Sequence, residues 1–179
     1  MTVDQTQHDR SHPKRQATLR PLTVEDEPLL WLILMYAAHE TSLEEVQQSP
    51  ALVRYLQNWG RIGDRGWVAE VRSEVVGAAW VRCWPGSDKG YGYVADDVPE
   101  LAIAVVPEYQ SLGIGTQLLT AIKQDVQQNH YAAMSLSVRA DNPAMQLYKR
   151  FGFVSVENSS VPNRVGGTSL IMLCEFSSQ

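Results

Sequence analysis

Residues 99–120, PELAIAVVPEYQSLGIGTQLLT, decide how this 179-residue chain is interpreted. An apolar run of strand length, residues 101–106, lies between two prolines. From position 114 onward the apolar residues recur as on one face of a helix: Ile114, Leu118, Leu119, Ile122 and Val126. Gly113 and Gly115 stand where the strand pattern gives way to the helix pattern. The stretch therefore predicts a buried strand, a turn and an amphipathic helix.

The two glycines predict an anion site at the start of that helix. They leave backbone N–H groups unobstructed at the positive end of the helix dipole. Two common phosphate loops are excluded, because Leu118 stands where the dinucleotide fingerprint needs a third glycine, and the Gly-Lys pair of a Walker loop is absent. The alternative is an ordinary turn in which the glycines only permit close packing.

The composition is that of one globular domain. Hydrophobic residues make up 44% of the chain and charged residues 20%, and the net charge of −5 argues against nucleic-acid binding. The longest apolar run, residues 29–38, is too short to span a bilayer, and the N-terminus has no signal-peptide pattern. We therefore expect a cytoplasmic protein with no membrane or nucleic-acid partner.

No metal site is expected. Cys83 and Cys174 lie in apolar, strand-like runs, which favours free buried thiols. His8 and His12 are spaced for one helical face but have no third ligand in view.

The order of the predicted elements indicates one mixed sheet flanked by helices. Residues 1–16 are polar without periodicity and predict a disordered tail, which leaves a single domain over residues 17–179. Strands are predicted at 17–20, 67–71, 75–84, 101–106, 133–138, 153–156 and 169–176. Helices are predicted at 25–39, 50–59, from 114 onward, and at 142–151. Residues 85–98 form a long loop, a candidate wall for a substrate.

Two blocks carry a resemblance to a known family. Gln110-x-x-Gly113-x-Gly115 resembles the acyl-coenzyme A signature of the GNAT superfamily of N-acetyltransferases. Residues 142–153, NPAMQLYKRFGF, look like a second GNAT block and are in register from Ala144 onward, with Asn142 one residue closer to the alanine than usual. The resemblance covers residues 17–176. It implies a single-domain α/β (α+β) fold, with a mixed, mostly antiparallel sheet of six to seven strands and about four helices.

The resemblance also implies acetyl-coenzyme A (acetyl-CoA) as co-substrate. In the family, main-chain groups of the central strand hold the pantetheine arm, and those of the glycine loop hold the pyrophosphate. Carried over to this sequence, the implied contacts are Val105, Val106, Gln110, Leu112, Gly113, Ile114, Gly115, Thr116, Asn142 and Tyr148. A helix cap is the alternative role of Asn142.

Two catalytic roles follow from the resemblance. Tyr148 matches the general acid that protonates the leaving thiolate, although core packing on one helical face explains an aromatic there as well. Glu100 matches the base that takes the proton from the amine, and its alternative is a solvated carboxylate at a strand end. No cysteine stands at a recognisable nucleophile position, so direct attack in a ternary complex is expected.

The acceptor is the least specified part. Relatives build this pocket from the first two helices, the loop after the third strand and the last hairpin. Here the candidates are Tyr36, His39, Trp84 and Asp97, a mixture that suits a cationic amine of a small molecule or peptide. A solvated acidic loop explains Asp97 equally well. A different acyl chain or acceptor, or a non-catalytic acyl-CoA sensor, remains open. The family often pairs through sheet edges, which allows a homodimer.

Overall fold

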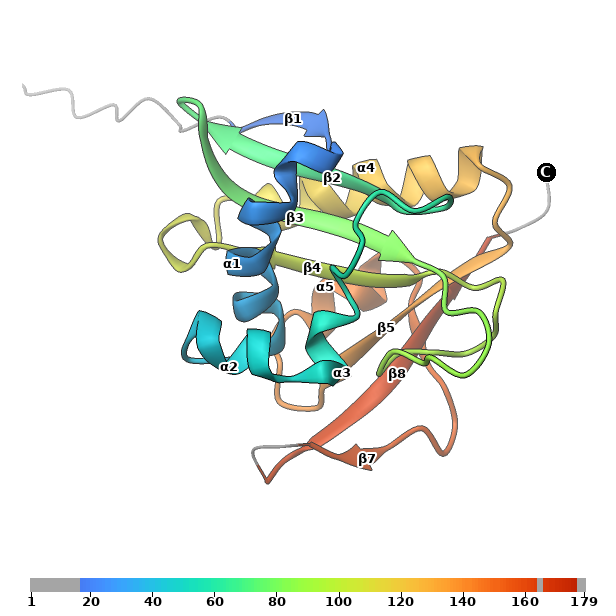
Figure 1. Cartoon of the computed structure of the whole chain (residues 1–179). Helices are drawn as coiled ribbons and strands as arrows, with labels where there is room; N and C mark the ends of the chain where they lie inside the picture. The colour runs from blue at the N-terminus through green and yellow to red at the C-terminus, as the bar shows by residue number, and fades with distance from the viewer. Residues whose placement is uncertain (1–16, 164–165, 177–179) are drawn as a thin grey trace, which may run out of the picture.

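The computed structural model describes residues 17–163 and 166–176, and the predicted tail with His8 and His12 lies outside them. The fold is one twisted sheet between two layers of helices (Figure 1). Its strands are β1 (Thr18–Pro21), β2 (Arg65–Val71), β3 (Glu74–Arg82), β4 (Glu100–Val105), β5 (Ala133–Arg139), β6 (Val154–Ser155), β7 (Val161–Pro162) and β8 (Thr168–Glu175). They are ordered β1-β2-β3-β4-β5-β8-β6, with β7 also on β8. The predicted mixed, mostly antiparallel sheet is confirmed. It has eight strands rather than the predicted six to seven, because two short strands of two residues each, β6 and β7, also pair with β8.

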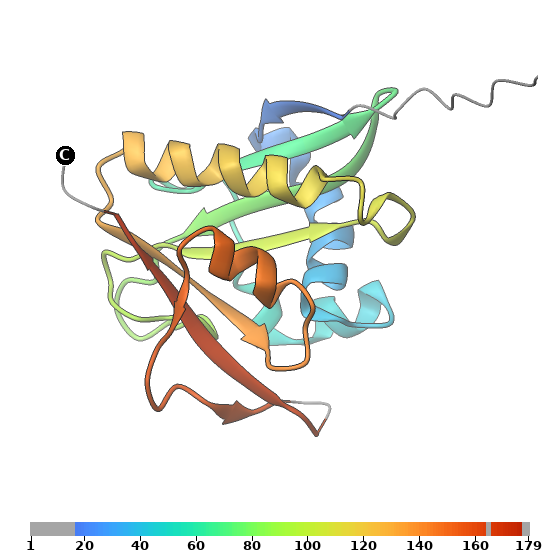
Figure 2. The same ribbon diagram turned by 180° about the vertical axis from the view of Figure 1, so that it is seen from behind.

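The helices divide between the two faces of the sheet. The front layer in Figure 1 is α1 (Glu27–Ala38), α2 (Leu43–Gln48) and α3 (Pro50–Val53), preceded by the 3₁₀ turn η1 (Val24–Asp26). The layer in front in Figure 2 is α4 (Ile114–Gln128) and α5 (Met145–Arg150), and a second 3₁₀ turn, η2 (Pro107–Tyr109), precedes α4. No helix in the described ranges is long and apolar enough to cross a membrane.

The amphipathic helix predicted from position 114 is confirmed as α4. Its five stripe residues, from Ile114 to Val126, are each at most 1% exposed and pack against the sheet beside Met134 and Met172. Burial of five aliphatic side chains at about 2 kcal/mol each is what fixes α4 to the sheet. The glycine turn is thereby held at the end of β4.

The helix predicted over 50–59 is much shorter in the structure. α3 ends at Val53 and turns follow, because the Arg82 guanidinium takes the carbonyl oxygens of Arg54 and Gln57 as acceptors. The separate helix α2 was not predicted. It starts with a capping box in which Ser42 Oγ accepts from the Glu45 N–H and the Glu45 carboxylate accepts from the Ser42 N–H.

Two neighbouring strands diverge in the middle of the sheet. β4 and β5 are parallel, and their only register pair is Glu100 with Ser135. On its other edge β4 pairs with β3 along its whole length. From Leu101 onward, the β5-facing edge of β4 has no strand partner within the described chain. The backbone N–H and C=O groups on this edge of β4 are therefore available to form hydrogen bonds with a ligand.

Candidate functional site

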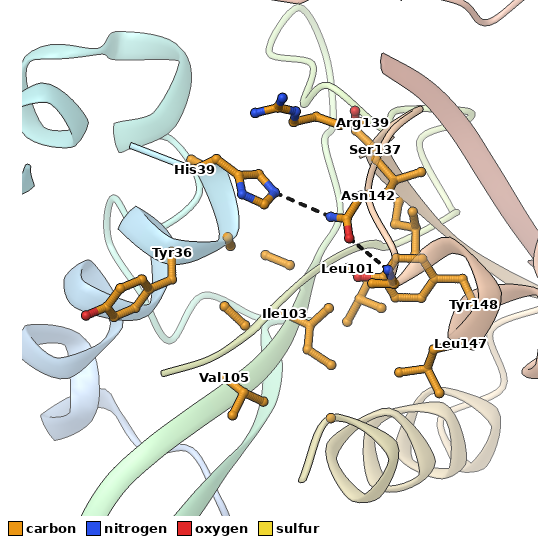
Figure 3. Close-up of a pocket in the computed structure, with 18 of the residues that line it drawn as sticks. Tyr36, His39, Leu101, Ile103, Val105, Ser137, Arg139, Asn142, Leu147 and Tyr148 are labelled. Atoms are coloured by element: carbon orange, nitrogen blue, oxygen red, sulfur yellow. Dashed lines mark hydrogen bonds between the residues drawn. The ribbon is translucent and has the colours of Figure 1, made fainter. Parts of the chain in front are cut away.

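The gap between β4 and β5 opens into a cavity of about 660 Å³. Side chains from both strands, the start of α4, α5 and the end of α1 surround it (Figure 3). Of the residues predicted for the site, the following line it: Tyr36, His39, Glu100, Val105, Gln110, Gly113, Gly115, Thr116, Asn142 and Tyr148. Tyr36 contributes to the wall, but its ring points away from Tyr148. The fold therefore brings together two blocks that are about 30 residues apart in the sequence.

Five predicted residues do not line the cavity. Ile114 is only 1% exposed and packs in the core under α4. The Leu112 side chain is 52% exposed to solvent, and Val106 packs against the core cluster that contains the α1 residues. Trp84 is buried edge-on against the Tyr55 ring, with centroids 5.0 Å apart, and Asp97 lies on the exposed surface of the 85–98 loop. Trp84 and Asp97 are not among the residues that line the cavity, so the cavity does not support their prediction as acceptor contacts.

The start of α4 has the geometry expected of an anion site. Gly113 is the N-cap, with φ of 83° in the left-handed region, where a side chain would be strained. The Gly113 carbonyl accepts from Gln117 N–H, so the N–H groups of the first turn have no partner within the helix. Gln110 Nε2 donates to the Val105 carbonyl (3.0 Å) and ties the loop back to β4.

Tyr148 lies in the core and in the cavity wall at once. Its ring packs edge-on against Phe153, with centroids 5.9 Å apart, and its hydroxyl points into the cavity toward β4 (Figure 3). Burial raises the pKa of Tyr148 to about 12. The phenol therefore keeps its proton at neutral pH, as a proton donor must.

Glu100 is a buried carboxylic acid at the inner end of the cavity. Only 2% of the residue is exposed, and Oε1 accepts hydrogen bonds from the Tyr55 hydroxyl (2.5 Å) and the Gly92 N–H (2.8 Å). Oε2 has no hydrogen-bond partner among the described residues. Burial raises the pKa of Glu100 to about 7, although the hydrogen bonds from Tyr55 and Gly92 and the nearby Trp84 indole N–H favour the ionised form. A carboxyl with this pKa gains and loses its proton near neutrality, which suits a general base.

This burial predicts a stability effect that does not depend on activity. In the folded chain Glu100 stays protonated up to a pH of about 7, whereas the unfolded carboxyl ionises near 4.5. Between pH 4.5 and pH 7 the folded state therefore binds more protons than the unfolded state. The contribution of Glu100 protonation to the unfolding free energy is lost as the pH rises through this range. Relative to Glu100→Gln, wild type should lose about 2 to 3 kcal/mol of unfolding free energy between pH 5 and pH 8. Urea unfolding of both proteins at both pH values measures this, and a pH-independent difference would contradict it.

His39 and Asn142 meet across the mouth of the cavity. The Asn142 Oδ1 accepts from the Ala144 N–H (2.8 Å), so its Nδ2 faces His39 Nε2 at 3.3 Å (Figure 3). Because Nδ2 can only donate, Nε2 accepts, and the imidazole is neutral with its proton on Nδ1. Burial, with the nearby Arg139 charge, lowers the pKa of His39 in the same sense. Asn142 caps the turn before α5, which begins at Met145 rather than directly after Asn142.

The unpredicted residues of the cavity wall include Tyr55 and Arg139. Arg139 is the last residue of β5, one position beyond the predicted end of this strand, and the strand pattern could have indicated it. Tyr55 has no local signal, because its contact with Glu100 joins residues 45 positions apart.

A family model described as the acetyltransferase (GNAT) family matches residues 31–153. The chain belongs to the GNAT family of acetyltransferases. The family predicted from the two sequence blocks is thus confirmed, and its members are acyltransferases.

Two curated relatives are N-acetyltransferases. An N-alpha-acetyltransferase of Sulfurisphaera tokodaii is 39% identical over 94 residues, which are 50% of this chain and 56% of the relative. The ribosomal protein bS18-alanine N-acetyltransferase of Haemophilus influenzae is 31% identical over 85 residues, 45% of this chain and 58% of the relative. The matched part thus spans little more than half the length of these relatives.

Solved structures agree with the fold. The ribosomal-protein-alanine N-acetyltransferase of Brucella melitensis has a TM-score of 0.68 at 24% identity, covering 89% of this chain and 99% of that one. YncA of Salmonella typhimurium, solved with its cofactor acetyl-CoA, has a TM-score of 0.67 at 18% identity, with 92% and 96% covered. At these identities the likeness establishes the fold.

Proposed function

We propose that this GNAT chain transfers the acetyl group of acetyl-CoA to a primary amine by direct attack in a ternary complex. The observation that carries the proposal is the single cavity that joins the start of α4 to Glu100 and Tyr148. The co-substrate fits this cavity because the free edge of β4 can pair with the pantetheine amides. The N–H groups at the start of α4 can bind the pyrophosphate.

Each step of the transfer has a residue of suitable chemistry. Glu100 takes a proton from the substrate ammonium, and the neutral amine attacks the thioester carbonyl carbon. The C–N bond forms, the C–S bond breaks, and the Tyr148 hydroxyl gives its proton to the leaving sulfur. The attacking nitrogen loses its second proton as the amide forms, and this proton restores the Tyr148 phenol. The two groups differ in pKa, about 7 for Glu100 and about 12 for Tyr148, in the order that a base and an acid need. Alignment of the two substrates in one cavity supplies a further part of the rate.

For the acceptor we propose the α-amine of a peptide or protein N-terminus. One curated relative is named an N-alpha-acetyltransferase and the other an N-acetyltransferase of an alanine in ribosomal protein bS18, and these names support the class without fixing the sequence. The cavity also continues between the end of α1 and β7, where His39, Glu40 and Val161 form its outer walls. A peptide could extend through that opening while its first residue lies near Glu100.

The test is thiol release from acetyl-CoA with matched acceptors. Short peptides with alanine, serine or methionine as first residue are compared with the same peptides acetylated at the N-terminus and with a polyamine. Turnover with free peptides alone is expected. Turnover with the polyamine alone would overturn the peptide assignment but keep the amine transfer. Thermal stabilisation by acetyl-CoA without any turnover would favour the sensor. No stabilisation would refute the binding site itself.

A further inference from the structure

The Tyr55 hydroxyl is the centre of a three-way contact in the acceptor end of the cavity. It donates to Glu100 Oε1 at 2.5 Å and accepts from the Tyr91 N–H at 2.8 Å. The Tyr55 ring also lies 5.0 Å from Trp84, edge-on, and 6.5 Å from Tyr91, stacked. Burial, with the neighbouring Glu100 charge, raises the pKa of Tyr55 well above its ordinary value, so the phenol remains a donor.

The backbone on both sides of Tyr55 is held as well. Arg82 Nη1 donates to the carbonyl oxygens of Arg54 (2.6 Å) and Gln57 (3.0 Å). The Trp80 indole N–H donates to the carbonyl of Tyr55 itself (3.3 Å). Tyr55 is thus fixed by two residues of β3 from behind while its hydroxyl reaches the carboxylate. Such double support is what keeps a functional group in a single orientation.

The second donor to Glu100 is held with similar closeness. Gly92 lies so near β5 that a Cβ there would come within 2.6 Å of the backbone at Leu136 and Ser137, and within 2.9 Å of Glu100 Oε1. The 85–98 loop is further tied to the Tyr55 segment, because Arg54 Nη1 donates to the Lys89 carbonyl (2.8 Å). The loop and the turn after α3 therefore act on the same carboxylate oxygen.

We propose that Tyr55 is a positioning residue for Glu100: together with Gly92 it holds Oε1 and so stabilises the ionised carboxylate that takes the proton of the substrate amine. This inference rests on the proposed function, in which Glu100 is the base. Other groups around Glu100 cannot replace Tyr55. Within the described chain the Trp84 indole N–H lies near the carboxylate and also favours its ionised form, but it makes no hydrogen bond as close as that of Tyr55, and no charged side chain contributes to the ionisation of Glu100.

A purely structural role of Tyr55 is the alternative, since its hydroxyl also secures the 85–98 loop through Tyr91. The two roles differ in their pH dependence. Removing a donor from the ionised carboxylate disfavours that form and raises the pKa of Glu100, whereas a loosened loop would lower activity at every pH.

The deciding experiment is the pH profile of kcat/KM for acetyl transfer in wild type, Tyr55→Phe and Tyr93→Phe. Tyr93→Phe is the matched control, because it removes a phenol of the same loop region that donates to Asp96 outside the cavity. In Tyr55→Phe the acidic limb of the kcat/KM profile should move to higher pH by about one unit, because the pKa of Glu100 rises when the donor is lost. Activity should then fall about tenfold at pH 6 and recover to about the wild-type value near pH 9. The KM for acetyl-CoA should stay unchanged, and Tyr93→Phe should follow wild type.

An unmoved limb, or the same loss at every pH, would overturn the inference while leaving the transfer reaction intact. If wild type shows no turnover, the proposed function has failed, and the inference is then tested without catalysis. The unfolding free energies of wild type and Tyr55→Phe are each compared with those of their Glu100→Gln counterparts between pH 5 and pH 9. A midpoint of this difference that is about one pH unit higher in the Tyr55→Phe pair supports the positioning role, and equal midpoints refute it.

Discussion

Tyr148→Phe is expected to lower kcat for acetyl transfer by about 10²- to 10⁴-fold, the range typical of a lost general acid. The substitution removes only the hydroxyl that points into the cavity, because the ring remains buried against Phe153. The leaving thiolate must then take its proton from water or depart as an anion. The affinity for acetyl-CoA should change little, since the groups proposed to bind it lie on β4 and at the start of α4. Single-turnover kinetics and calorimetric titration measure the two quantities separately.

The Tyr148→Phe variant should fold like wild type, so that a loss of kcat can be attributed to the missing hydroxyl and not to unfolding. Among the described residues the buried Tyr148 hydroxyl makes no hydrogen bond, and Phe preserves the aromatic packing. Tyr93→Phe again serves as the control for loss of a phenol outside the cavity. A loss of less than threefold in kcat would mean that Tyr148 is a packing residue, the alternative that its position on the helix already allowed.

The sequence predicted β4, the glycine turn and α4 best, because their signals are local. A strand, a glycine turn and a helix follow one another between Leu101 and Val126, and each has its own pattern. The stripe of α4 and the left-handed Gly113 are therefore readable without any tertiary contact. Tyr148 was predicted for the same reason, as part of a contiguous block.

The part of the cavity around Glu100 depends on contacts that no short sequence pattern encodes. Trp84 and Asp97 were predicted from the regions that form the acceptor pocket in relatives, and here one is buried against Tyr55 while the other faces solvent. Tyr55 was missed because the segment after Val53 was predicted as helix, and the groups that end this helix are supplied by Arg82 of β3. Sequence periodicity therefore predicts which face of an element is buried, but not which polar groups meet inside.

Asp64→Ala is expected to destabilise the chain by about 3 to 5 kcal/mol, because it leaves a buried cation without its counter-ion. The Arg82 and Asp64 side chains are only 1% and 2% exposed. Arg82 Nε and Nη2 donate to the two carboxylate oxygens at 2.9 and 2.5 Å. Asp64 also accepts from the N–H groups of Gly60 and Arg61 and so closes the turn before β2. Urea unfolding at pH 7 measures the loss.

The same substitution should disturb the acceptor wall, because Arg82 links the ion pair to the segment that carries Tyr55. Asp96→Ala is the matched control, since it breaks an exposed ion pair with Lys89 (2.8 Å) and should leave the unfolding midpoint close to wild type. If the two variants unfold at the same urea concentration, Asp64 does not sustain the buried cation. If Asp64→Ala is strongly destabilised, any variant that weakens Arg82 must be checked for folding before its activity is attributed to Tyr55 and Glu100.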